Sequence, residues 1–90
     1  MLFSEDANNI IALMYLESMK DNCNLDAVRK QPEINYLDMK TFTSIVKQLS
    51  DEHYIQNANF AQSSKEVLIA FLSDASLTNK GKRYVEQNLM

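Results

Sequence analysis

The sequence predicts one α+β domain over residues 1–90, in which a three-helix core precedes a two-stranded β-hairpin and a final helix. Three observations predict this class. Apolar residues recur at helical spacing in the first half and at the end of the chain, whereas residues 54–72 are strand-like. The chain has one glycine and one proline, too few for an all-β protein built from tight turns. Its 90 residues suffice for a single compact domain.

The first predicted helix runs from about Asp6 to Lys20 and is apolar around most of its circumference. Such a helix must be covered on more than one side, and a short chain offers little protein for this. We therefore expect one side to lie in the core and the other to form a two-fold contact in a homodimer. The simpler alternative is that both sides are core. The residues expected at the dimer interface are Ile11, Tyr15, Leu16, Met19, Val85 and Leu89.

A short helix is predicted from Leu25 to Lys30. Asn24 is a favourable N-cap residue ahead of it. The Gln31-Pro32 pair ends it, because the residue before a proline is disfavoured in the α-helical region.

The clearest element is a helix that starts at the N-cap Asp38 and extends to Asp51. The Asp38 carboxylate can accept the amide hydrogen of Thr41 and is attracted to the positive end of the helix. One apolar stripe, at i, i+3, i+7 spacing, consists of Met39, Phe42, Ile45, Val46 and Leu49. The opposite, polar face is expected to be exposed; it carries Lys40, Thr41, Thr43, Ser44, Lys47 and Gln48, together with Asp51.

The period changes after this helix, and the pattern indicates a hairpin. Residues Tyr54–Phe60 are predicted as the first strand. Residues Val67–Leu72, rich in β-branched and aromatic side chains, are predicted as a second strand buried on both faces or nearly so. The polar stretch Ala61–Glu66 would form the tip, and Ser73–Ser76 would connect the hairpin to the last helix.

The last helix is expected to be capped by Thr78 and to reach toward Leu89. The start of this helix carries a basic cluster, Lys80, Lys82 and Arg83, although the positive end of a helix dipole does not favour cations. A phosphate or an acidic partner would explain this placement, as would simple solvation.

Two segments carry a resemblance to a known family. The run Lys40–Ile55 resembles the recognition helix and the following strand of winged helix-turn-helix proteins. The run Leu77–Val85 looks like the leucine-threonine-x-x-glycine start of the helix that follows the hairpin, or wing, in many bacterial members. The likeness spans about residues 6–90, and the chain looks closest to the small YjcQ-like proteins of Gram-positive bacteria and their phages. It implies a winged-helix fold and a role in DNA binding and transcription regulation.

The chain departs from the family pattern at two places. Winged-helix proteins usually place glycine just after the recognition helix, where the backbone is left-handed, but here the position holds His53. The predicted hairpin tip has Lys65 as its only base, beside Glu66, which weakens the expected contact of the wing with phosphate.

The functional prediction is a small DNA-binding regulator whose helix Asp38–Asp51 enters the major groove of double-stranded DNA. Short polar and long basic side chains can read base edges there. The residues expected to do so are Lys40, Thr41, Thr43, Ser44, Lys47 and Gln48, and those expected to hold phosphate are Arg29, Lys30 and Lys65. An ordinary solvated helix face would have the same composition, and Arg29 and Lys30 also suit the negative end of their own helix.

The competing prediction is a winged-helix module that binds another protein and not DNA, such as a phage or mobile-element inhibitor. The net charge of −3 disfavours sequence-independent binding of nucleic acid. The apolar first helix also suits a protein partner.

No catalytic, cofactor or metal site is predicted. Cys23 and His53 are the only cysteine and histidine, which excludes an internal disulfide and a zinc site, and the sequence has no phosphate-binding loop. We therefore expect neither enzymatic activity nor a cofactor. The longest apolar run has seven residues, whereas roughly 20 are needed to cross a bilayer. A cytoplasmic location without membrane contact is expected.

Overall fold

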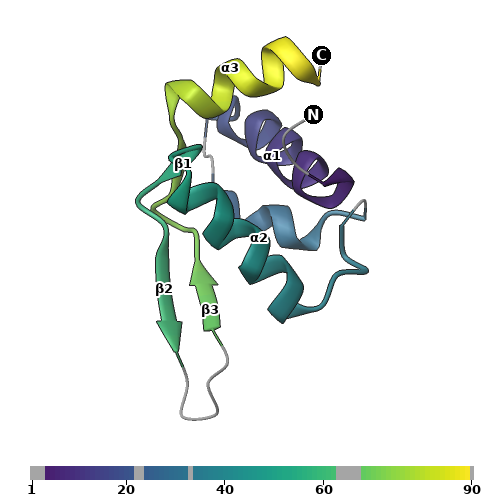
Figure 1. The fold of residues 1–90 in the computed structure, drawn as a ribbon, viewed down its shortest axis with the longest axis vertical. Helices are drawn as coiled ribbons and strands as arrows, with labels where there is room; N and C mark the ends of the chain where they lie inside the picture. Colours follow the sequence, from purple (N-terminus) through teal and green to yellow (C-terminus); the bar gives the residue numbers. More distant parts are fainter. Residues whose placement is uncertain (1–3, 22–23, 33, 63–67, 90) are drawn as a thin grey trace.

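The computed structural model describes residues 4–21, 24–32, 34–62 and 68–89 and has an α+β architecture, which confirms the predicted class (Figure 1). The elements in chain order are α1 (Glu5–Ser18), the 3-10 helix η1 (Leu25–Lys30), α2 (Met39–Asp51), β1 (Ile55–Gln56), β2 (Asn59–Gln62), β3 (Leu68–Phe71), β4 (Ser76–Leu77) and α3 (Asn79–Asn88). The helices form one body, from which the β2–β3 ribbon extends.

Helix α1 begins after Ser4, whose side-chain oxygen accepts a hydrogen bond from the amide of Ala7 at 3.2 Å. It ends at Ser18, two residues before the predicted end. Ile11 of α1 and Val85 of α3 are core residues. The prediction that these two form a dimer interface is therefore wrong, because α3 packs against α1 of the same chain and covers this side of the helix.

Helix α2 has the predicted N-cap and most of the predicted apolar stripe; the prediction is wrong at Met39, which is exposed in the first turn. The Asp38 carboxylate accepts the amide hydrogen of Thr41 at 2.7 Å. The fully buried apolar residues of the stripe are Phe42, Val46 and Leu49. The prediction of an exposed face is wrong at Thr43, which is 1% exposed. Helix α2 packs against β3, and Lys47, one turn after Thr43, reaches the Phe60 ring of β2. We infer that the ribbon covers this side of α2.

The chain leaves α2 through a left-handed residue. His53 has a φ of 66°. Its amide donates to the carbonyl of Ser50 at 3.0 Å, and the amide of Tyr54 donates to the carbonyl of Leu49 at 2.9 Å. This pair of bonds is a Schellman motif, which satisfies two of the carbonyls that a helix end leaves free. Histidine thus occupies a conformation that glycine adopts more easily.

The hairpin is present but is divided into two short antiparallel pairs. β1 pairs with β4, with Ile55 opposite Leu77, and β2 pairs with β3, with Phe60 opposite Ala70. Asn57, with a φ of 63°, lies between β1 and β2 and interrupts the strand that was predicted to be continuous.

The second half of the hairpin differs from the prediction in two ways. β4 begins at Ser76, within the predicted connector. The sequence could not predict this strand, because two residues are too few to show a period. Phe71 is 49% exposed, although its neighbour Ala70 is buried, so β3 is not buried on both faces.

Helix α3 is capped by Thr78 as predicted, since the Thr78 hydroxyl oxygen accepts the amide hydrogen of Gly81 at 3.1 Å. The Tyr84 hydroxyl donates to Asn8 Oδ1 at 2.6 Å and joins α3 to α1 inside the core. None of the helices in the described ranges combines the length and the apolar character needed to span a bilayer.

Candidate nucleic-acid interface

The exposed face of α2 is the candidate interface. Five of the six residues predicted to read bases are exposed there: Lys40, Thr41, Ser44, Lys47 and Gln48. They recur three to four residues apart and therefore lie on one face of the helix. The β2–β3 ribbon lies beside this helix, so the helix face and the ribbon form neighbouring surfaces (Figure 1).

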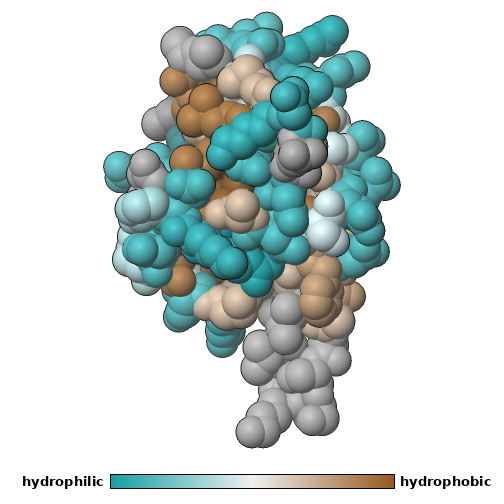
Figure 2. Space-filling view, turned by 180° about the vertical axis from the view of Figure 1, so that it is seen from behind, coloured by the Kyte–Doolittle hydropathy of each residue, from teal (hydrophilic) through white to brown (hydrophobic). Residues whose placement is uncertain are grey.

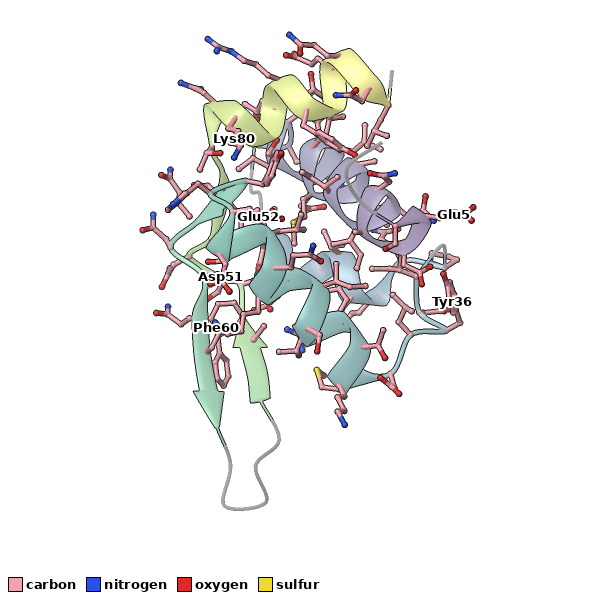
Figure 3. The ribbon with its side chains drawn as sticks, viewed as in Figure 1. Glu5, Tyr36, Asp51, Glu52, Phe60 and Lys80 are labelled. Carbon is pink, nitrogen blue, oxygen red and sulfur yellow. The ribbon has the colours of Figure 1, made fainter. Side chains whose placement is uncertain are left out.

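The two lysines of this face differ in their surroundings. Lys47 Nζ lies 3.4 Å from both carboxylate oxygens of Asp51 and 5.7 Å from the centre of the Phe60 ring (Figure 3). Asp51 partly neutralises Lys47, although an exposed pair of this kind is weak. Lys40 forms no hydrogen bond or ion pair with any other described residue. Lys40 is therefore the less compensated positive charge of the face, near the amino-terminal end of α2.

The N-cap of α2 binds the backbone of one of the residues predicted to read bases. The backbone amide of Thr41 donates to the carboxylate of Asp38 at 2.7 Å, and this bond, together with the nearby Thr41 side chain, holds the pKa of Asp38 below its usual value. Ser44 and Gln48 make no side-chain hydrogen bonds within the described ranges, so their polar groups are free to bind a ligand.

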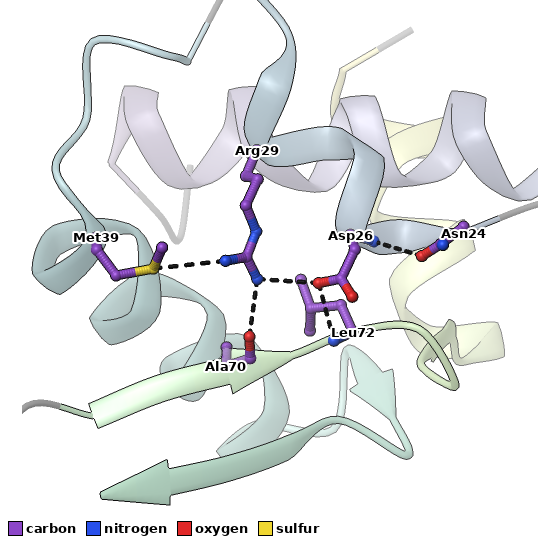
Figure 4. A network of polar contacts seen from close by, with 6 residues as sticks. All are labelled: Asn24, Asp26, Arg29, Met39, Ala70 and Leu72. Atoms are coloured by element: carbon purple, nitrogen blue, oxygen red, sulfur yellow. Dashed lines mark hydrogen bonds and ion pairs between the residues drawn. The ribbon is translucent and has the colours of Figure 1, made fainter. Parts of the chain in front are cut away.

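Arg29 makes structural contacts that the sequence did not predict (Figure 4). Its Nη2 donates to the carbonyl of Ala70 at 2.7 Å and to Asp26 Oδ1 at 2.9 Å. Its guanidinium carbon lies 5.4 Å from the centre of the Phe42 ring. These contacts hold η1 against β3 and α2 and occupy both hydrogens of Nη2, whereas Nη1 contacts only the Met39 sulfur, at 3.6 Å. The phosphate contact of Arg29 stays a prediction. Asp26 was not predicted as its partner, although the i, i+3 spacing could have indicated the pair.

The other two residues predicted to hold phosphate have different outcomes. Lys30 is exposed at the end of η1 and forms no ion pair in the described part of the chain. It remains a candidate for a phosphate contact. Lys65 lies outside the described residues.

The exposed residues of the predicted dimer surface lie on the outer side of α1. Leu16 is 54% and Met19 is 60% exposed. A groove of about 150 Å³ beside them is lined by Ala12, Tyr15, Leu16, Val85 and Leu89. Figure 2 shows that apolar surface gathers on this back view in the half of the molecule away from the hairpin. At the rim, the Tyr15 hydroxyl donates to Glu86 Oε2 at 2.8 Å, which raises the pKa of Tyr15.

Among the described residues, no three His, Cys, Asp or Glu side chains come together as ligands for a metal ion. Comparison of the chain with protein-family models, with curated protein sequences and with solved structures finds no match.

Proposed function

We propose that this chain is a small winged-helix protein that binds double-stranded DNA and regulates transcription by inserting α2 into the major groove. The observation that carries the proposal is the exposed row of amine, hydroxyl and amide groups on α2, next to a projecting β-ribbon. The order of the elements, with a hairpin between α2 and α3, is also the order of a winged-helix domain.

The dimensions and the chemistry of α2 suit this docking. A helix with its side chains is about 10–12 Å wide, and the major groove is about 12 Å wide. Recognition helices contact bases mainly through their amino-terminal residues. In α2 these are Lys40 and Ser44, while Gln48 lies one turn further and offers an amide of the kind that pairs with adenine.

Few phosphate contacts are expected from such a surface. Lys30, Lys40 and Lys47 are its described cations, and Asp51 opposes them. Each neutralised phosphate contributes about 0.9 to the slope of the logarithm of affinity against the logarithm of salt concentration. Binding to random duplex should therefore be weak, with a slope of about 2–3.

Fluorescence-anisotropy titration of a random duplex over a salt series tests the proposal. Lys40→Ala should reduce the slope by about one. Lys82→Ala, which removes an exposed lysine from α3, is the matched control and should leave the slope unchanged. Absence of binding at low salt, or equal effects of the two variants, would contradict insertion of α2 into DNA.

A second candidate function is a protein-binding module, such as a phage or mobile-element inhibitor. The exposed Leu16 and Met19 beside an apolar groove favour it, because exposed apolar patches often mark protein contacts. The same surface supports the proposed homodimer, which would present two α2 helices to half-sites one DNA turn apart, about 34 Å. Light scattering at micromolar concentration tests the dimer: a mass near 10.4 kDa, that of one chain, would exclude it.

A further inference from the structure

A second groove runs along α3, on the side that faces Tyr54. It has a volume of about 330 Å³ and is lined by Tyr54, Lys80, Arg83, Tyr84, Gln87 and Asn88. The five α3 residues follow the spacing i, i+3, i+4, i+7, i+8 and so form one row along the helix. This groove is separate from the exposed face of α2, and two of its residues, Lys80 and Arg83, belong to the basic cluster for which the sequence left a phosphate or an acidic partner open.

The groove is cationic although the chain as a whole is acidic. The sequence has 12 Asp and Glu against nine Lys and Arg. The described lining nevertheless contains Lys80 and Arg83 and no acidic side chain. Glu86, the acidic residue of α3, is turned toward α1, where it accepts the hydrogen bond from Tyr15. The positive charge of the groove therefore lacks a carboxylate within its own lining.

One wall of the groove is held in place by contacts inside the protein. Lys80 Nζ donates to the carbonyl of Glu52 at 2.8 Å and lies 4.5 Å from the centre of the Tyr54 ring (Figure 3). The Tyr54 and Tyr84 rings are buried and pack edge to face, with centroids 5.5 Å apart. The cation and the aromatic wall are thus positioned before any ligand arrives, which lowers the entropic cost of binding.

The remaining polar groups are donors that are available to a ligand. Arg83 is exposed and has no hydrogen-bond or ion-pair partner in the described part of the chain. Its guanidinium fork matches two oxygens of one phosphate. Gln87 is exposed one turn further and has no side-chain hydrogen bond there either. Asn88 Nδ2 donates to the Tyr84 carbonyl at 3.0 Å, which leaves its second amide hydrogen.

We infer that this groove binds a phosphate group, with Arg83 as the principal ligand and Lys80 and Gln87 as further donors. Phosphate suits it better than carboxylate, because its additional oxygens can accept from guanidinium, ammonium and amide at once. The phosphate belongs either to the backbone of a bound duplex or to a free phosphate compound. The first case rests on the proposed function, in which α2 binds DNA. Lys80 contacts the carbonyl of Glu52, the residue after α2, and so connects the groove to that helix.

Titration with inorganic phosphate, followed by NMR of the Arg83 Nε–H and the Gln87 side-chain amide, tests the site directly. We expect saturable shifts that sodium chloride at equal ionic strength does not produce. Arg83→Gln should weaken phosphate binding about tenfold, the loss of one charged hydrogen bond. Lys82→Gln removes the same charge from a neighbouring exposed position outside the groove and should change the affinity less than twofold. Absence of saturation, or equal losses in both variants, would overturn the inference.

The duplex titration then identifies the source of the phosphate. If it is the DNA backbone, Arg83→Gln should reduce the salt slope by about one and Lys82→Gln should not. If the duplex does not bind, or binds Arg83→Gln and wild type equally, a positive phosphate titration assigns the groove to a free phosphate compound. In that case the site stands even where the proposed DNA binding fails.

Discussion

The carboxylate of Asp26 and the guanidinium of Arg29 lie 2.9 Å apart and together occupy the outer edge of the β3 segment (Figure 4). Asp26 Oδ1 accepts the amide hydrogen of Leu72 at 3.1 Å, while Arg29 donates to the carbonyl of Ala70. These are the backbone groups that a further strand would bind. The ion pair therefore takes the place of a third strand and protects an edge that would otherwise be open to pairing.

Arg29→Ala should lower the free energy of unfolding by about 1–2 kcal/mol. The Ala70 carbonyl would lose a donor and the Phe42 ring would lose its cover, while partial exposure of the ion pair limits the loss. Urea denaturation measures the change. Lys30→Ala, which removes the adjacent exposed charge, should change stability by less than about 0.5 kcal/mol. Similar losses in the two variants would show that Arg29 does not hold the strand edge.

His53→Gly should stabilise the protein by about 0.5–1 kcal/mol, because glycine adopts the left-handed conformation without the clash of a Cβ atom. The gain is smaller than the full left-handed penalty, since glycine also increases the entropy of the unfolded chain. Thermal unfolding should show an increase in Tm of a few degrees. Asn57→Gly is the control at a second left-handed residue. Its gain should be smaller, because asparagine tolerates this conformation better; an equal or larger gain at Asn57 would contradict the argument.

The free energy of unfolding should fall at acid pH, and protonation of Asp38 should account for part of this loss. The amide and hydroxyl of Thr41 lower the pKa of Asp38 in the folded state, so the folded protein binds a proton there less readily than the unfolded chain. The stabilisation by Asp38 is complete above the pKa that its carboxyl has in the unfolded chain, about 3.9, and is lost as the pH falls through the lower pKa of the folded state. Glu17, whose pKa is lowered by Lys20 and by the Asn24 amide, contributes with the same sign.

Urea unfolding between pH 7 and pH 2 measures this dependence. Asp38→Asn keeps a capping oxygen but has no carboxyl group to titrate. Its stability should therefore fall less steeply below pH 4 than that of the wild type. Parallel curves for the two proteins would show that Asp38 does not contribute to the acid dependence.

The features that the sequence predicted well depend on neighbouring residues in the chain. Asn24, Asp38 and Thr78 each cap the helix that follows them, as their types and positions indicated. The stripe of α2 was predictable for the same reason, because a helical period is visible within 13 residues.

The features that it did not predict depend on contacts between distant parts of the chain. Thr43 is of a residue type common on surfaces, and its burial depends on how α2 packs against other parts of the chain, β3 among them. Arg29 is held by a carbonyl 41 residues away, at Ala70. The break at Asn57 follows from pairing of β1 with β4, which local alternation cannot show. The exposed row of polar residues on α2 was therefore largely predictable, whereas the contacts that hold the surrounding elements in place were not.

Gly81 lies where α3 closely approaches the chain between α2 and β1. A Cβ atom at this position would lie 2.2 Å from the carbonyl oxygen of Tyr54, far inside van der Waals contact. That oxygen cannot move freely, because it accepts the amide hydrogen of Thr78 at 3.1 Å. Gly81→Ala should therefore displace the first turn of α3 or break this hydrogen bond. We expect a loss of about 1–3 kcal/mol in the free energy of unfolding, the range seen when extra atoms enter a packed site.

Helix propensity acts in the opposite direction at this position, since alanine is favoured over glycine by about 1 kcal/mol within a helix. The sign of the change thus shows which effect is larger. Asn79→Ala, in the same turn and exposed, is the control, and urea denaturation should show a change within about 0.5 kcal/mol. If Gly81→Ala were as stable as the wild type or more so, α3 could move away from Tyr54 at little cost, and the close approach would not explain the glycine.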